Sequence, residues 1–479
     1  MSLKKSLIKE ALFYGVGDML TKAIAFVLIP LYTNALPPKE YGIYQLLVLF
    51  ITTAMVFVMS GMNAALFKHF VVTKDETLRR RYFTATVVWV VISSVILVGL
   101  SYLLARPLSY LLTGNYGRGG LVGLAAINAG LEALILVSLL IFRMEKRPIG
   151  YVSYNVVKVV LIVAGNILLV WFLNMGVSGI ILAGIAADVI ILAPLLWRVG
   201  HYLTLPLSFR FIWPLFLWGI PFVPSSIASV ILTLSDRLIL RFMAGLGPAG
   251  IYSVGYKLAG VVFLFYTAFR FAWGPYMFEL GRDTTVANRT YPKVLLPLIS
   301  FLGLSAVGLV GISPELYRFF VGEAYHASRA VLIPVSLAAM FEAMALFFGA
   351  GMQTRDRTIY LPFVTGMAAI LNIALNIWLI PRFGFMGAAW ATLISYVVMA
   401  YMHLRLGDPL MPVKYPWPKI AAIVLITAMG ITAVWFLGPL VSRLGAILAT
   451  AALLWVTSGG ISGAIRQVTS ITYGIKRNT

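Results

Sequence analysis

Apolar segments of membrane-spanning length recur along the whole chain. Each is about 20 residues long, which is enough to cross the hydrocarbon core of a bilayer as an α-helix. Short polar turns separate the segments, and no stretch between them is long enough for a soluble domain. This pattern predicts an all-α polytopic membrane protein with about fourteen transmembrane helices. They lie at about residues 11–33, 41–63, 83–105, 119–142, 150–173, 177–199, 213–238, 249–271, 294–313, 329–350, 358–380, 385–405, 418–438 and 444–465.

Composition agrees with this prediction and excludes several classes of chemistry. Hydrophobic residues make up 61% of the 479 residues, and the mean hydropathy is +0.95, far above that of soluble domains. The absence of cysteine excludes disulfides and thiol chemistry, and the four histidines are scattered. No Walker loop is present, so we expect no ATP hydrolysis. The first segment lacks a small-residue cleavage site and is expected to remain as a span.

The formal net charge of +21 reflects topology rather than nucleic-acid binding. About 25 of the 37 Lys and Arg fall on one side of the predicted membrane, which is the positive-inside pattern. We therefore expect a protein of the cell (cytoplasmic or inner) membrane with both termini in the cytoplasm and basic turns that contact anionic lipids. The basic segments are residues 4–9, 68–81, 143–147, 198–210, 270–293, 355–357, 405–419 and the tail from Arg466.

Short motifs repeat at a constant offset. Gly42-Ile43-Tyr44 returns 208 residues later as Gly250-Ile251-Tyr252, and Gly176 and Gly179 return at the same offset as Gly384 and Gly387. This repeat predicts an N-terminal six-helix lobe (1–205), a C-terminal six-helix lobe (206–410) and two additional helices with a cytoplasmic tail (411–479). Parallel repeats of this kind are typical of transporters whose site lies between the lobes near the bilayer midplane.

Several cations are predicted at membrane depth. Lys22 lies near the middle of the first apolar segment, where an unpaired lysine costs about 2.5–3.5 kcal/mol. Asp18 lies one turn before it on the same helical face, so the pair either neutralises itself for packing or faces an aqueous cavity. The other cations in this set are Lys158, Lys257 and Arg270. With few carboxylates beside them, such groups suit a phosphate or diphosphate.

Other intramembrane polar residues suggest ion coupling. Ser226, Ser229, Thr233 and Asp236 share one face of a predicted helix, with Arg237 placed to snorkel outward. With Asn372, Asn376, Thr392 and Ser395 they form an oxygen-rich set that suits Na⁺, or a proton on Asp236. The alternative is a hydrogen-bonded cluster that holds the helices together. Gln45 is a candidate contact for a polar substrate. Further polar groups, for packing or proton handling, are Asn128, Glu132, Asp188 and Glu342.

The order of several motifs resembles polysaccharide transporters of the multidrug/oligosaccharidyl-lipid/polysaccharide flippase superfamily, over about residues 1–410. The motifs are Lys22 with residues 28–33, residues 40–44, Ser235-Asp236-Arg237, Tyr256-Lys257-Leu258-Ala259, Phe269 with residues 272–275, residues 372–376, residues 380–384, residues 386–389, and Ala391-Thr392. Residues 411–479 match only in the number and position of their helices.

The resemblance implies two six-helix lobes, alternating access, and flipping of an undecaprenyl-diphosphate-linked oligosaccharide to the outer leaflet for O-antigen-like polysaccharide. Related lipid II flippases imply a cationic cavity and a lipid-tail groove formed by the two added helices. Relatives hold Na⁺ at positions that map onto Asp236, Asn372, Asn376 and Thr392, but Asn376 replaces a second acid, which leaves a proton as the rival ion.

Besides Na⁺ or H⁺ no cofactor is implied. The expected partners are the lipid-linked substrate, membrane lipids, a polysaccharide polymerase and the chain-length machinery. A cation-coupled drug or metabolite antiporter of the same superfamily is the alternative function. An enzyme is not expected, because the longest outer loop, about residues 313–328, offers too few catalytic groups.

Overall fold

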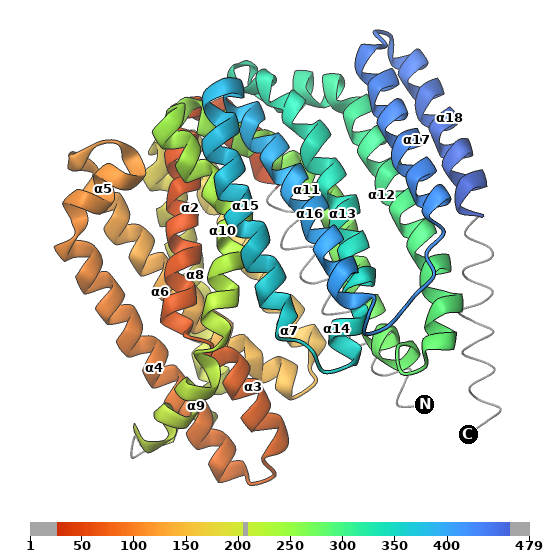
Figure 1. Ribbon diagram of the computed structural model, residues 1–479. Helices are drawn as coiled ribbons and strands as arrows, with labels where there is room; N and C mark the ends of the chain where they lie inside the picture. The colour runs from red at the N-terminus through yellow and green to blue at the C-terminus, as the bar shows by residue number, and fades with distance from the viewer. Residues whose placement is uncertain (1–25, 205–208, 460–479) are drawn as a thin grey trace. The chain divides into compact units, whose positions relative to one another are not determined.

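The computed structural model describes residues 26–204 and 209–459, and within these ranges every regular element is a helix (Figure 1). Among these described residues, thirteen helices are long and apolar enough to cross a membrane. They correspond to the second through the fourteenth predicted segments, and the end of the first segment forms the short helix Phe26–Ala35. The predicted all-α polytopic membrane class is confirmed. Asp18 and Lys22 lie outside the described residues.

The packing divides the chain into two compact units, Met1–Ser253 and Val254–Thr479. The boundary falls inside α11 (Leu246–Leu280), whereas the sequence repeat places it between residues 205 and 206. The first unit thus contains the opening helices of the second predicted lobe. That the lobes 1–205 and 206–410 are repeats with the added segment 411–479 stays a prediction, and the two units are described separately.

Unit 1 is built around α6, a helix that packs against α2, α4 and α8. Its contact face carries small residues, among them Ala125, Ala129 and Ala133, which let neighbouring helices approach closely. Apart from the start of α11, the elements of this unit after Phe26–Ala35 are α2 (Pro38–Met59), α3 (Met62–Val72), α4 (Glu76–Leu103), α5 (Ala105–Thr113), η1 (Tyr116–Arg118), α6 (Gly119–Met144), α7 (Pro148–Asn166), η2 (Ile167–Phe172), α8 (Gly176–Val199), η3 (Gly200–Tyr202), η4 (Phe209–Phe211), α9 (Ile212–Gly219) and α10 (Phe222–Met243).

Local sequence explains where these helices begin. Pro38 and Pro148 stand in the first turns of α2 and α7, where a missing N–H carries no penalty. Asp75 caps α4 by accepting hydrogen bonds from the backbone N–H groups of Thr77 and Leu78. These residues therefore set the first turns of α2, α4 and α7.

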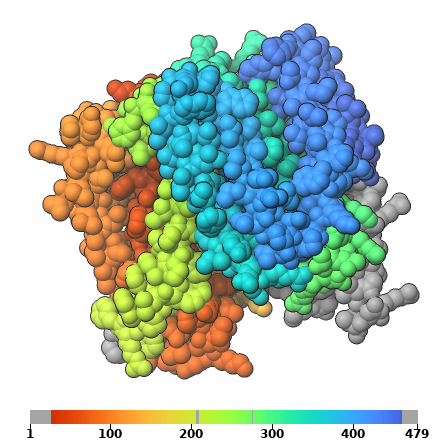
Figure 2. Space-filling view, in the orientation of Figure 1, coloured from red at the N-terminus to blue at the C-terminus, as the bar shows by residue number. Residues whose placement is uncertain are grey.

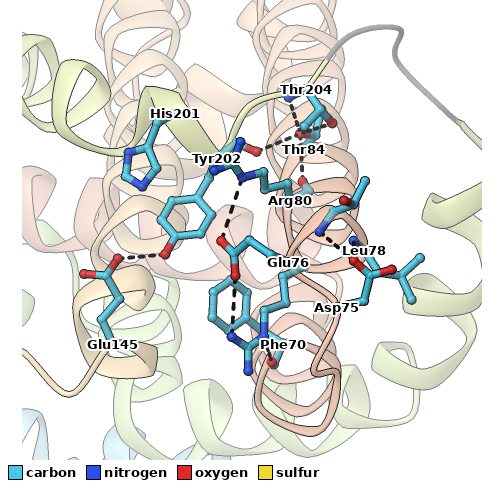
Figure 3. A network of polar contacts seen from close by, with 12 residues as sticks. Phe70, Asp75, Glu76, Leu78, Arg80, Thr84, Glu145, His201, Tyr202 and Thr204 are labelled. Atoms are coloured by element: carbon cyan, nitrogen blue, oxygen red, sulfur yellow. Dashed lines mark hydrogen bonds and ion pairs between the residues drawn. The ribbon is translucent and has the colours of Figure 1, made fainter.

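One end of unit 1 gathers three basic turns, and we call it the basic end (residues 68–81, 143–147 and 198–204). Figure 3 shows its polar network. The Tyr202 hydroxyl donates to the Glu145 carboxylate at 2.7 Å, and the Thr84 hydroxyl contacts the Tyr202 carbonyl at 3.3 Å. Glu76 lies 3.5 Å from the Arg79 guanidinium. These contacts join the start of α4, the α6–α7 turn and the end of α8.

Unit 2 contains α12, which packs against α13, α17 and α18. Buried Arg443 of α18 donates to the Gly311 carbonyl at 2.6 Å and to the Glu315 carboxylate at 2.9 Å, both on α12. The described elements after α11 are α12 (Thr284–Phe320), η5 (Glu323–Val331), α13 (Leu332–Phe348), α14 (Ala350–Thr354), α15 (Tyr360–Phe383), α16 (Phe385–Gly407), α17 (Trp417–Phe436) and α18 (Leu440–Ser458).

The outward surfaces of α17 and α18, blue in Figure 2, carry exposed apolar side chains such as Phe436, Val441 and Val456. An aqueous surface rarely leaves so many large apolar side chains uncovered. These two helices, like the other candidate spans, therefore present the surface expected of a helix in contact with lipid.

Candidate functional site

The centre of the candidate site in unit 1 is Lys158, on α7. Its Nζ lies 2.7 Å from Asp188 Oδ1 on α8 and 3.3 Å from Glu132 Oε1 on α6. The Asn128 amide donates to the other Asp188 oxygen at 3.0 Å. Asp188 is fully buried, the Lys158 side chain is 15% exposed, and that of Glu132 is 34% exposed. The ion pair of Lys158 with buried Asp188 is therefore shorter and better shielded from solvent than its ion pair with Glu132.

This arrangement corrects one expectation from the sequence. Lys158 was expected to have few carboxylates beside it, but two carboxylates surround it, and their combined charge exceeds its own. An anion that reaches the ammonium group from the cavity would have to compete with both carboxylates. Its role as a diphosphate ligand stays a prediction, now with that condition attached.

A cavity of about 240 Å³ opens beside this ion-pair cluster, entirely within unit 1. The lining side chains come from α2, α3, α6 and α7. Its apolar wall consists of Met55, Ile135, Leu136, Leu139 and Leu140. Its polar lining consists of Asn63, Glu132, Arg143, Tyr151, Asn155 and Lys158. Because α6 rises 1.5 Å per residue, Glu132 and Arg143 are separated by about 16 Å along the helix. We call this space the α6–α7 cavity.

Sequence reasoning missed Asn63, Arg143, Tyr151 and Asn155 as site residues. A signal was nevertheless present on α7, because Tyr151, Asn155 and Lys158 follow one another at spacings of four and three and so share a helical face. Arg143 was assigned to a basic turn, and nothing in the sequence showed that it lines a cavity.

The other predicted substrate contacts occupy separate places. Gln45 is buried in α2, and its Nε2 has no hydrogen-bond partner among the described residues. Lys257 is half-buried in α11 of unit 2. Arg270, on the same helix, is exposed, and its guanidinium lies over the Tyr266 ring at 5.9 Å from the centroid. The structure describes no geometry that joins these three residues.

Asp236, the predicted coupling acid, is buried in unit 1 and already has partners. Its carboxylate lies 2.7 Å from Arg237 Nη1 and accepts a hydrogen bond from the Tyr252 hydroxyl. Arg237 is only 3% exposed, so the expectation that it snorkels outward is wrong. The hydroxyls of Ser229 and Thr233 donate to carbonyls one turn back on α10. The predicted polar face therefore exists, but much of it is satisfied within the helix.

Asn372, Asn376 and Thr392 lie in unit 2 and are fully buried. The Asn376 side-chain amide donates to the side-chain oxygen Oδ1 of Asn372 at 2.9 Å, and the Thr392 hydroxyl donates to the Ala388 backbone carbonyl at 3.0 Å. Asn376 Oδ1 has no hydrogen-bond partner among the described residues. A neutral oxygen donor of this kind fits Na⁺. The described oxygens of this cluster carry no negative charge, and Asp236 of unit 1 already pairs with Arg237, so each unit taken by itself fits Na⁺ only in part.

Comparison with known families identifies the chain. The family described as "Polysaccharide biosynthesis protein" matches residues 7–281, which is more than half of the sequence. The chain belongs to this family.

Two proteins with sequences similar to this chain come from Haloferax volcanii. "Probable low-salt glycan biosynthesis flippase Agl15" is 23% identical over 287 residues, which cover 58% of the chain and 59% of the relative. "Probable flippase AglR" is 30% identical over 180 residues, or 36% of the chain and 37% of the relative. The chain thus matches less than two thirds of the length of either relative.

Two kinds of transporter share the fold of this chain. It resembles "Lipid II flippase MurJ, inward closed conformation" with a TM-score of 0.74 and 16% identity, over 93% of this chain and 97% of that one. The MATE multidrug transporter DinF-BH gives a TM-score of 0.62 and 16% identity, over 86% of this chain and 98% of that one. At these identities the likeness establishes the fold, that of a multi-pass membrane protein.

Proposed function

We propose that the protein is a flippase that moves an undecaprenyl-diphosphate-linked oligosaccharide from the cytoplasmic to the outer leaflet by alternating access. The observation that carries the proposal is the α6–α7 cavity, a space lined by charged and amide groups within the membrane-spanning helices of a polysaccharide biosynthesis protein. Charged groups inside membrane-spanning helices are costly to bury, and they typically mark substrate or ion pathways. The flippase names of the relatives and the lipid II flippase fold support the same interpretation.

The orientation follows from the charges. The basic end of unit 1 faces the cytoplasm in this proposal, in an inner or cytoplasmic membrane, with both chain termini on that side. Lys22, Lys257 and Arg270 attract the diphosphate, Asp18 orients Lys22, and Gln45 contacts a polar part of the substrate. The product passes to a polysaccharide polymerase and its chain-length machinery for O-antigen-like surface polysaccharide.

The driving force in this proposal is an ion gradient or the membrane potential, which supplies about 2.3 kcal/mol per charge per 100 mV. Asp236, Asn372, Asn376 and Thr392 are the proposed coupling residues. Because Arg237 already neutralises Asp236, coupling requires that this ion pair open during the cycle. The coupling ion in this proposal is Na⁺ or a proton.

The test is export of surface polysaccharide in cells that carry Lys22→Ala or Lys257→Ala at wild-type expression. Loss of export in either variant supports the diphosphate role. Lys419→Ala is the matched control, because Lys419 is exposed at the start of α17. Normal export in both test variants would remove the binding role. Efflux of a dye by the wild type, with no polysaccharide defect on deletion, would favour the drug or metabolite antiporter instead.

A further inference from the structure

The α6–α7 cavity is electrically balanced, and this separates it from a diphosphate site. Glu132 and Lys158 line it, Asp188 lies directly behind Lys158, and Arg143 lines the end nearer the α6–α7 turn. Two carboxylates and two cations give a formal sum of zero. A diphosphate carries several negative charges and needs a surplus of positive charge in a low-dielectric site. The α6–α7 cavity has no such surplus of positive charge.

What the cavity does offer is groups that bind hydroxyls. Asn63 and Asn155 present planar amides, and Glu132 presents a carboxylate that is one-third exposed. The Asn155 amide donates to the Tyr151 carbonyl at 2.8 Å, which fixes the side chain and leaves its carbonyl oxygen able to accept. Amides and carboxylates pair with neighbouring hydroxyls through two parallel hydrogen bonds. A rigidly held amide binds them with little loss of side-chain entropy.

The rest of the lining is aliphatic. Leu136, Leu139 and Leu140, together with Ile135, line the cavity along α6. A pyranose ring has edges covered with hydroxyls and faces formed by C–H groups, so it suits a space lined by both polar and aliphatic side chains. The volume of about 240 Å³ lies below the range of about 300–1,000 Å³ typical of sites for drug-sized ligands. It is of the size of a single sugar ring.

We propose that the α6–α7 cavity is a monosaccharide subsite, which holds one sugar ring of the lipid-linked oligosaccharide while the diphosphate binds elsewhere. The inference rests on the flippase function proposed above and deepens it by assigning a sugar-binding role to Asn63, Asn155 and Glu132. Lys158 then acts as a positioning residue, because its bonds to Asp188 and Glu132 hold the Glu132 carboxylate at the cavity wall.

The test compares two kinds of probe on the full-length protein in lipid nanodiscs. Farnesyl diphosphate carries the phosphates alone, and farnesyl-diphospho-sugars with glucose, galactose or N-acetylglucosamine add one ring. Wild-type protein should bind at least one glycosylated probe more tightly than farnesyl diphosphate. Asn155→Leu should weaken that probe about 10-fold, as expected when a bound hydroxyl loses its partner, and should leave farnesyl diphosphate unchanged.

Two further variants make the test specific. Leu136→Trp should fill the cavity and cause the same selective loss without removing a polar group. Ser153→Leu is the matched control, because Ser153 is an exposed residue of α7 outside the cavity lining. Equal loss of both probes, or no loss in either cavity variant, would overturn the sugar subsite and leave the flippase proposal standing. Wild-type protein that binds neither kind of probe would overturn both.

Discussion

Gly42 of α2 and Gly250 of α11 face each other across a helix crossing. A Cβ added to Gly42 would collide with the Leu246 carbonyl oxygen and lie 3.2 Å from the Gly250 amide nitrogen. A Cβ added to Gly250 would collide with the Pro38 carbonyl oxygen and lie 3.0 Å from the Gly42 amide nitrogen. The two contacts are equivalent. Each glycine meets the carbonyl oxygen of the residue four positions before the other glycine, and both Leu246 and Gly250 follow their counterparts Pro38 and Gly42 by 208 residues.

This reciprocity is what a two-fold relation between two copies of a helix requires. The backbones of equivalent helices approach each other at equivalent residues, and only glycine allows so close an approach. The same contacts explain why the packing boundary at Ser253 differs from the predicted repeat boundary between residues 205 and 206. The start of α11 packs against α2, and so does α10 before it. The opening helices of the predicted second lobe therefore belong to unit 1.

We predict that Gly42→Ala or Gly250→Ala destabilises the protein by about 1–3 kcal/mol, the usual penalty of overpacking. The added methyl group meets backbone atoms, which cannot rotate away. Thermal unfolding in detergent measures the effect. Gly99→Ala is the control, because a Cβ on this glycine of α4 meets no atom within 4 Å. An unchanged melting temperature for both test variants would contradict the close crossing.

The sequence was informative about the fold because its signal is local. Each apolar segment must satisfy its backbone hydrogen bonds internally, so length and hydropathy alone predict a spanning helix. All thirteen candidate spans among the described residues correspond to predicted segments. The bends and breaks depended on other features. The π-helical turn η2 that extends α7, for example, follows Asn166, whose side chain accepts a hydrogen bond from the Tyr32 hydroxyl at 3.0 Å, and no local pattern predicts such a contact.

Side-chain partners depended on tertiary packing and could not be predicted in the same way. The sequence indicated that Lys158, Glu132 and Asp188 lie within spans, but it could not show that three different helices bring them together. Arg237 illustrates the reverse case. It lies near the end of a span, where snorkelling is common, yet its neighbour Asp236 and the Thr233 carbonyl hold it inside.

The buried pair of Asp236 and Arg237 leads to a prediction about stability. Asp236→Asn leaves the Arg237 charge without its carboxylate at a site only 3% exposed, so we expect a loss of about 3 kcal/mol. The double variant Asp236→Asn/Arg237→Gln removes both charges and should recover much of that loss. Thermal unfolding of the single and double variants measures the coupling. A double variant that is no more stable than Asp236→Asn would show that the pair does not stabilise the fold.

Arg443 anchors α18 to α12 in unit 2. Arg443→Ala removes the donor to the Gly311 carbonyl and the ion pair with Glu315, and we expect a loss of about 2 kcal/mol, typical of hydrogen bonds to charged groups. Arg443→Lys keeps the charge but not the two-pronged geometry, so it should retain only part of the stability. Limited proteolysis after residue 407 reports detachment of α17 and α18. Equal protection of the wild type and Arg443→Ala would exclude an anchoring role.

Glu132→Gln changes the charge of the α6–α7 cavity without much change in shape. The amide oxygen can still accept from Lys158, which Asp188 continues to hold at 2.7 Å. The formal sum of charges rises from zero to +1, so the cavity should now attract phosphate. We expect farnesyl diphosphate to bind about 10-fold more tightly, the order of magnitude of one added charge at a partly shielded distance, and the preference for glycosylated probes to shrink. Glu323→Gln, at an exposed acid of η5, is the control. If Glu132→Gln left both affinities unchanged, the charge balance of the cavity would play no part in substrate selection.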